Sequence, residues 1–134
     1  MSAETPGVFE LTADTFAAKI DGHPFAVVDF WAPWCAPCRA FAPTFAAAAA
    51  KHPDVLFAKV DTEAQPALGA QFNIRSIPTL MIFRDNIIVY AEAGALRPSA
   101  LDQVLEAARA LDMAQVRRDV EAQSAAPAVS GDSG

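Results

Sequence analysis

Residues 25–51 decide the fold: they read Phe25-Ala-Val-Val-Asp-Phe-Trp-Ala-Pro-Trp-Cys-Ala-Pro-Cys38 and continue as an alanine-rich run that ends near Lys51. The first seven residues are nearly all apolar, which is typical of a short strand covered on both faces. An Ala-Pro pair then turns the chain. The alanine-rich run predicts a helix, because alanine is the best helix former. The stretch therefore predicts a buried strand and a helix with both cysteines at their junction.

Outward from this stretch, helices and strands alternate. We predict helices over residues 12–20, 65–71 and 98–111, and strands over residues 55–60, 79–84 and 87–93. Asp85 and Asn86 have the chemistry of a tight turn, so the last two strands form an antiparallel hairpin. Strands linked by helices imply a parallel pair with right-handed crossovers. The predicted fold class is α/β with a mixed sheet.

The composition fits one globular domain. The chain has 134 residues, of which 53% are hydrophobic, and its net charge is −6. This charge argues against nucleic acid or an anionic membrane as the main partner, and no apolar run is long enough to span a membrane. We expect a flexible start at residues 1–6, a domain at 7–115, and a frayed helix with a disordered tail at 116–134. Residues 1–10 lack the features of a signal peptide, so we expect a cytoplasmic protein.

The only two cysteines, Cys35 and Cys38, form one Cys-x-x-Cys motif. A zinc site would need two more ligands, and the chain offers only His23 and His52, which lack the usual spacing. Two buried thiols without a function are the second alternative, but prolines and a tryptophan surround the pair, as in a loop at a helix start. The third alternative is a redox dithiol, and the sequence favours it. We expect no metal and assign neither histidine a role.

The spacing of the motif suits redox chemistry. Cys35 falls at the start of the predicted helix, where unpaired N–H groups and the positive end of the dipole favour a thiolate. Cys38 lies three residues further on the same side, within reach of a disulfide. Pro37 in the first turn costs no hydrogen bond, because its N–H would be unpaired there.

The chain resembles the thioredoxin family over about residues 7–112. The resemblance rests on Val28 to Arg39, on Ala42-Pro43, on Ile74-Arg-Ser-Ile-Pro-Thr79 and on Gly94-Ala95, which match successive family motifs in order and spacing. It implies the thioredoxin fold, a central mixed sheet flanked by helices. Ala36 departs from the family, which typically has glycine between the cysteines.

The resemblance also implies roles for the neighbours of the cysteines. Asp29 matches a buried aspartate that takes the proton of the second cysteine, and Lys59 matches a lysine beside it. From the residues alone, a solvent-facing Asp29 and a solvated Lys59 at a sheet edge stay open. From the residues alone, the Ile77–Pro78 bond is expected to be trans, as most X–Pro bonds are. The resemblance implies a cis bond instead, which leaves the backbone of Ile77 free to pair with a substrate. An exposed apolar rim for binding protein substrates would consist of Trp34, Ala36, Pro37, Ile77, Gly94 and Ala95.

The implied activity is reduction of protein disulfides. Cys35 would attack a substrate disulfide, and Cys38 would resolve the mixed disulfide. A thioredoxin reductase that contains flavin and uses NADPH would reset the pair, while the protein itself, a monomer, would need no cofactor. Two alternatives are a thiol oxidase of the same fold and a binding or chaperone-like subunit without enzymatic activity.

Overall fold

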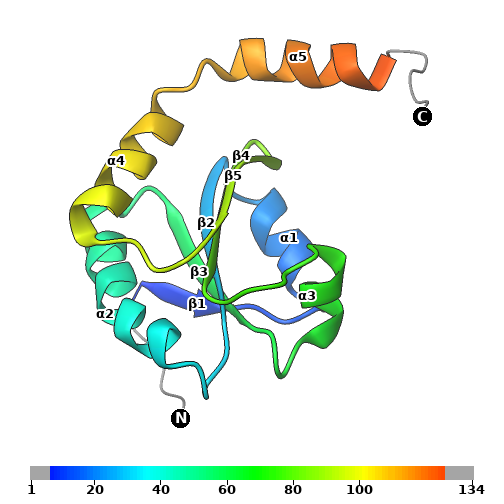
Figure 1. Cartoon of the computed structure of the whole chain (residues 1–134). Helices are drawn as coiled ribbons and strands as arrows, with labels where there is room; N and C mark the ends of the chain where they lie inside the picture. Colours follow the sequence, from blue (N-terminus) through cyan, green and yellow to red (C-terminus); the bar gives the residue numbers. More distant parts are fainter. Residues whose placement is uncertain (1–6, 126–134) are drawn as a thin grey trace.

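A five-stranded mixed sheet forms the centre of the molecule, as seen in a computed structural model that describes residues 7–125 (Figure 1). The strand order is β1-β3-β2-β4-β5. β1, β3 and β2 are parallel, whereas β4 is antiparallel to both β2 and β5. The strands are β1 (Val8–Glu10), β2 (Phe25–Trp31), β3 (Leu56–Asp61), β4 (Thr79–Arg84) and β5 (Ile87–Ala93). The predicted mixed α/β sheet and its closing hairpin are confirmed.

Helices cover both faces of this sheet. α2 and α4 lie on one face, and α1 and α3 lie on the other (Figure 1). The helices are α1 (Phe16–Asp21), α2 (Ala36–Lys51), α3 (Pro66–Gln71), α4 (Pro98–Arg109) and α5 (Met113–Ala125). None of the helices within residues 7–125 is long and apolar enough to cross a bilayer.

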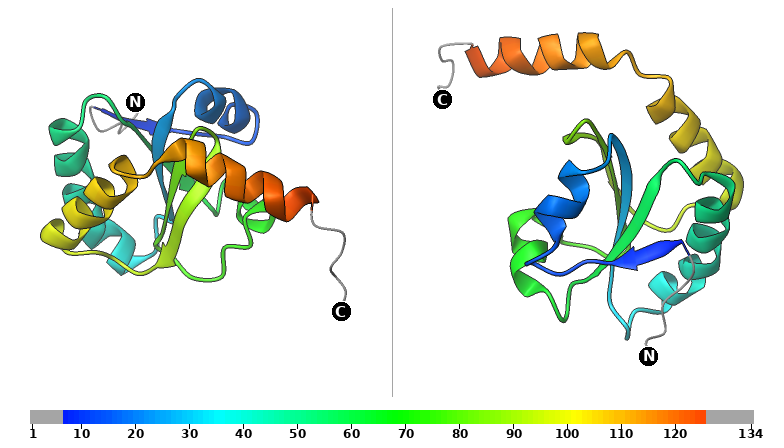
Figure 2. Two further views of the ribbon diagram at one scale, coloured as in Figure 1. Left: turned by 90° about the horizontal axis from the view of Figure 1, so that it is seen from above. Right: turned by 180° about the vertical axis from the view of Figure 1, so that it is seen from behind.

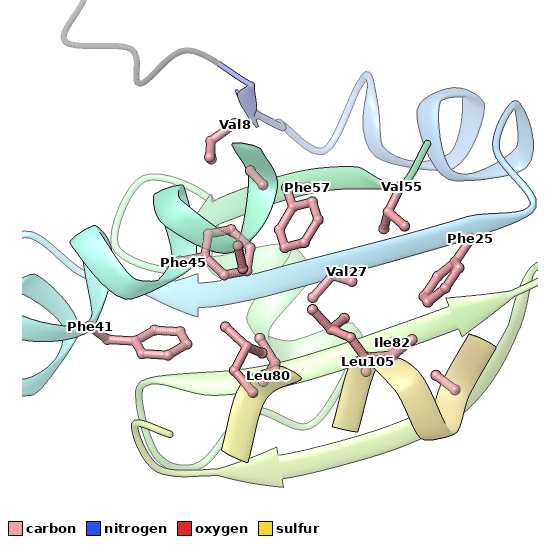
Figure 3. Close-up of a cluster of buried hydrophobic side chains, with 14 residues drawn as sticks. Val8, Phe25, Val27, Phe41, Phe45, Val55, Phe57, Leu80, Ile82 and Leu105 are labelled. Atoms are coloured by element: carbon pink, nitrogen blue, oxygen red, sulfur yellow. The ribbon is translucent and has the colours of Figure 1, made fainter. Parts of the chain in front are cut away.

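β2 is the central strand, and its alternate residues enter two separate cores. Phe25 and Val27 point to the face under α2 and α4, where they join a cluster with Phe45 and Phe57 (Figure 3). Val28 and its alternate neighbours join the cluster on the face of α1 and α3. Because both faces are covered, the strand is an almost continuous apolar run. This arrangement makes Asp29, on the same face as Val27, the exception in the strand.

Two elements differ from the sequence prediction near the N-terminus. The first helix begins at Phe16 rather than at Thr12. Thr12 and Thr15 form a turn instead: the Thr15 amide donates to the Thr12 carbonyl at 3.1 Å, and the Thr12 amide donates to Thr15 Oγ1 at 3.0 Å. β1 was not predicted, because three residues are too few to show a period. Its place in the sheet depends on pairing with β3.

α5 is a regular helix of 13 residues beyond the sheet. Figure 2 shows that it continues from the end of α4 and extends past the sheet. Arg117 pairs with Asp85 in the β4–β5 turn at 2.6 Å, which ties α5 to the turn. The predicted division at residue 115 falls inside this helix. The predicted flexible start and disordered tail involve residues 1–6 and 126–134, which lie outside the described residues, so both stay predictions.

Candidate active site

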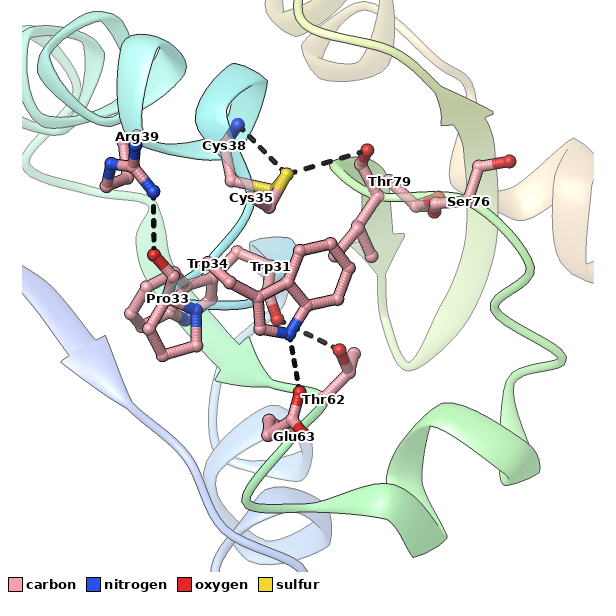
Figure 4. Close-up of a disulfide and its surroundings, with 11 residues drawn as sticks. Trp31, Pro33, Trp34, Cys35, Cys38, Arg39, Thr62, Glu63, Ser76 and Thr79 are labelled. Atoms are coloured by element: carbon pink, nitrogen blue, oxygen red, sulfur yellow. Dashed lines mark hydrogen bonds between the residues drawn. A yellow bond between two sulfur atoms is a disulfide. The ribbon is translucent and has the colours of Figure 1, made fainter.

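The two cysteines lie where β2 ends and α2 begins (Figure 4). Cys35 is the N-cap of α2, with an extended backbone, and its Sγ accepts the Cys38 amide N–H at 3.2 Å. A sulfur in this position receives an N–H group that the helix leaves unpaired, and it faces the positive end of the helix dipole. The site therefore favours the thiolate form of Cys35.

Cys35 and Cys38 form a disulfide, with their Cα atoms 5.2 Å apart. The expected disulfide reach is thus confirmed. Both cysteines are buried, with 4% and 2% of their surfaces exposed. They pack with Ala32 and are covered in part by Trp31 and Ile77. A substrate sulfur reaches the pair only by docking against the surface that surrounds it.

The loop before β4 lies against the disulfide. Its Ile77–Pro78 peptide bond is cis, as the family resemblance implied. The Ile77 carbonyl oxygen lies 3.8 Å from Cys35 Sγ. The loop is held on both sides, because Thr79 Oγ1 donates to the Ser76 carbonyl at 2.5 Å and the Gly94 amide donates to the Pro78 carbonyl at 2.7 Å. This bonding fixes Ile77 beside the sulfur.

An exposed rim surrounds the buried sulfurs. Trp34 is 67% exposed, and its indole N–H donates to Glu63 at 2.5 Å (Figure 4). Ile77 is half-buried, and the remaining predicted rim residues are exposed: Ala36, Pro37, Gly94 and Ala95. Glu63 and Arg39, whose guanidinium donates to the Pro33 carbonyl at 2.9 Å, add charges that the sequence did not suggest. No sequence signal identified Glu63, which lies in the loop after β3.

Asp29 is buried in β2, with 2% of its surface exposed. Its Oδ1 has no hydrogen-bond partner. Burial raises the pKa of this carboxyl from its ordinary 3.8 to about 7, and the positive charge of Lys59 opposes the rise. The solvent-facing alternative for Asp29 is therefore wrong. A carboxyl with such a pKa can accept a proton near neutral pH.

Lys59 lies beside Asp29 on the neighbouring strand. The two residues are direct partners in the parallel register of β2 and β3. β3 is an inner strand, between β1 and β2, so the edge-strand alternative for Lys59 is also wrong. The Lys59 ammonium lies 4.1 Å from the centre of the Trp31 ring. Trp31 in turn packs against the disulfide.

The two histidines lie apart from this site and have structural partners. His23 Nδ1 lies 2.9 Å from the Lys19 carbonyl oxygen, and His52 Nδ1 lies 3.0 Å from Arg109 Nη2. Within residues 7–125, no group of three or more His, Cys, Asp or Glu side chains is arranged to hold a metal ion.

Comparison with protein families and curated proteins gives one consistent result. The family model for thioredoxin matches residues 7–107. The chain is 49% identical over 116 residues to "Putative thioredoxin 2" of Streptomyces coelicolor, covering 87% of each chain. It is 46% identical over 98 residues to "Thioredoxin C-3" of Corynebacterium nephridii, covering 72% of this chain and 68% of the relative.

Solved structures show the same similarity. The oxidised form of mitochondrial thioredoxin 3 from Saccharomyces cerevisiae superposes with a TM-score of 0.69 and 28% identity, over 74% of this chain and 93% of that one. The Plasmodium falciparum thioredoxin gives a TM-score of 0.69 and 30% identity, over 73% of this chain and 96% of that one.

Proposed function

We propose, since this chain belongs to the thioredoxin family and is a thiol–disulfide oxidoreductase, that it reduces protein disulfides with Cys35 as the nucleophile. The position of Cys35 Sγ at the start of α2 is the observation that carries this assignment. Only a thiolate attacks a disulfide at a useful rate, and a helix N-terminus lowers the pKa of a thiol. Cys35 is therefore ready for attack once the pair is reduced.

In the first step, the Cys35 thiolate attacks one sulfur of the target disulfide. A mixed disulfide forms between Cys35 and that sulfur, and the second target sulfur leaves as a thiolate. In the second step, the Cys38 thiolate attacks the Cys35 sulfur. The mixed disulfide breaks, the first target sulfur leaves, and the Cys35–Cys38 disulfide forms. Two electrons pass from the pair to the target.

Asp29 supports the second step in this proposal. Cys38 must lose its proton before it attacks, and the acceptor must lie inside the protein, because Cys38 is buried. Asp29 is buried on the sheet face that α2 covers, and its pKa of about 7 lets it take a proton under ordinary conditions. Lys59 tunes this affinity by lowering the pKa of Asp29.

The rim and the Ile77 loop bind the target. The target segment lies extended beside Ile77, whose carbonyl is placed next to Cys35 Sγ and can pair with a backbone amide. Trp34 and the exposed rim residues supply apolar contact without sequence preference. This arrangement favours unfolded or extended protein segments as substrates.

The pair must be reduced again after each cycle. A flavin-containing thioredoxin reductase that uses NADPH is the partner that the family implies, and the protein itself, as a monomer, uses no cofactor. We place it in the cytoplasm, where thiols are kept reduced. The oxidation state of the pair at equilibrium distinguishes this function from that of an oxidase. A potential of about −270 mV is expected for the reductase, against about −120 mV for a strong oxidant.

The two cysteine variants test the proposal. The protein should reduce insulin disulfides with dithiothreitol as the electron source, and Cys35→Ser should abolish this activity. Cys38→Ser should keep the first step and accumulate mixed disulfides with cytosolic proteins, seen as slow bands on a non-reducing gel and released by added thiol. Trapping by Cys35→Ser instead would reverse the roles. A biological function that survives loss of both cysteines would favour a non-enzymatic binding subunit.

A further inference from the structure

Lys59 and Asp29 are placed to form an ion pair and do not form one. They are direct partners on neighbouring strands, which lie about 4.8 Å apart. The flexible four-carbon stem of a lysine easily spans this distance. Yet among the residues that the structure describes, the ion pairs are Lys51–Asp102, Arg109–Asp54 and Arg117–Asp85. Asp29 is in none of them, and its Oδ1 has no hydrogen-bond donor.

The Lys59 ammonium lies instead over the ring of Trp31, 4.1 Å from its centre. Trp31 follows Asp29 by two residues on β2, so both side chains are on the same face. The negative face of an indole attracts an ammonium, most strongly where water is excluded. The Trp31 ring is itself fixed, because it packs against the cluster of Ala32, Cys35 and Cys38 (Figure 4).

Among residues 7–125, Lys59 is the one cation that acts on the Asp29 carboxyl. β4 places Leu80 beside Asp29 in the antiparallel register. The buried side chains that α2 and α4 contribute to the adjoining cluster are all apolar. At the start of α2, Cys35 and Cys38 are joined in a disulfide, and the Arg39 guanidinium donates to the Pro33 carbonyl. On the other side of Lys59, β1 places the exposed Glu10 beside it in the parallel register. Asp61, two residues after Lys59, accepts hydrogen bonds from the Glu63 and Ala64 amides. The position of Lys59 therefore decides the electrostatics around Asp29.

We propose that Trp31 is a positioning residue that holds the Lys59 ammonium away from Asp29, so that the carboxyl stays without an ion-pair partner. Without the ring, the ammonium would move to the carboxylate and form the ion pair, which favours the charged form of Asp29. The proposal rests on the proposed function only where Asp29 serves as the proton acceptor of Cys38.

The test is an NMR pH titration of the Asp29 side-chain carboxyl in the oxidised protein, where the cysteines do not titrate. Trp31→Leu should lower the pKa of Asp29 by about one unit, at the low end of the effect of an adjacent opposite charge. Trp31→Phe keeps an aromatic ring, whose face attracts an ammonium less strongly than that of an indole, and should lower the pKa of Asp29 by less. In a Lys59→Gln background, neither substitution at Trp31 should lower the pKa of Asp29.

Phe9→Leu is the matched control. Lys19 lies over the Phe9 ring with its ammonium 4.4 Å from the centre, outside the site. This substitution removes a lysine–aromatic contact and should leave the Asp29 titration unchanged.

Two results would overturn the proposal. The first is an unchanged pKa of Asp29 in the Trp31 variants. The second is an equal shift with and without Lys59, which would show that Trp31 acts through solvation or packing. If Trp31→Leu does not fold, the same comparison can be made with Trp31→Phe: its shift of the Asp29 pKa is measured with Lys59 present and in the Lys59→Gln background. The titration needs no turnover, so failure of the disulfide-reductase function would be seen separately, in the insulin assay of the wild-type protein.

Discussion

The two ends of β2 differ in how the charged side chains beside them are paired. At the start of the strand, the Phe25 ring lies beneath Arg84 and Arg109, whose guanidinium carbons are 5.2 and 5.3 Å from its centre. Arg109 pairs with Asp54 at 2.6 Å, and Arg84 Nη1 donates to the Ala108 carbonyl at 2.6 Å. At the other end, Lys59 lies over the ring of Trp31, but Asp29 has no ion-pair partner among residues 7–125.

The carboxyls of Asp54 and Asp29 therefore differ in the direction of their pKa shifts. A hydrogen bond from Arg109 holds the pKa of Asp54 below its usual value. Burial raises the pKa of Asp29 to about 7, although the charge of Lys59 opposes the rise. The paired end holds the Arg109–Asp54 ion pair and contributes to structure, although the buried Nε of Arg84 has no hydrogen-bond partner. The unpaired end holds a buried carboxyl whose pKa lies near neutral pH, as expected of a candidate functional group.

Asp29→Asn should give the largest stability effect. The folded protein binds the Asp29 proton more tightly than the unfolded chain, so stability falls as pH rises from about 4 to about 7. A rise in pKa from 3.8 to about 7 corresponds to a cost of up to about 4 kcal/mol above pH 7. The variant should therefore match the wild type at pH 4 and exceed its free energy of unfolding at pH 8.

Urea denaturation at both pH values measures this difference. A variant that is destabilised equally at pH 4 and pH 8 would show that Asp29 contributes a hydrogen bond rather than an unpaired charge.

Arg84→Met should give the next largest effect, in the opposite direction. Arg84 donates to the Ala108 and Arg109 carbonyls at the end of α4, and their loss should cost about 2 kcal/mol. The methionine keeps apolar contact with Phe25. Turnover in the insulin assay should not change, because the residue lies about 20 Å along the sheet from the disulfide. Reduced turnover of a folded variant would mean that the two ends are coupled.

Asp54→Asn should give the smallest effect. Asp54 is exposed, so solvent and salt screen its pair with Arg109. Its pKa is lowered in the folded state, so the pair stabilises the protein above the ordinary pKa of 3.8 and this contribution is lost as pH falls further. Thermal unfolding at pH 7 should show a slight decrease in Tm that disappears at 1 M salt. A large decrease that persists in salt would indicate a structural role beyond the ion pair.

The part of the site that depends only on residues close together in the sequence could be predicted. The apolar run of β2 fixed the strand, and the cysteines followed at the start of a helix, so their reach could be predicted from spacing alone. The burial of Asp29 could not be predicted from the residues. A strand covered on both faces shows no alternation of apolar and polar residues that would assign a polar residue to one face. The family resemblance supplied that expectation.

Other features depend on tertiary contacts that no local pattern encodes. The indole of Trp34 is anchored by Glu63, 29 residues further along the chain. The Lys59 contact with Trp31 requires β3 to lie beside β2 in one register. α5 follows α4 after a short break and packs its first residue, Met113, into the protein. Its composition alone suggested fraying.

The central claim is that the unpaired Asp29 accepts the proton of Cys38, and the pH dependence of the second chemical step tests it most directly. Mixing the reduced protein with a chromogenic disulfide in a stopped-flow instrument forms the mixed disulfide at Cys35 in place, and the later release of the second chromogenic thiol by Cys38 can be followed from pH 5 to pH 9. For the wild type, the rate should rise with pH and show an inflection near pH 7. For Asp29→Asn, the inflection should vanish and release below pH 8 should be at least about tenfold slower. Identical profiles for the two proteins would contradict the account.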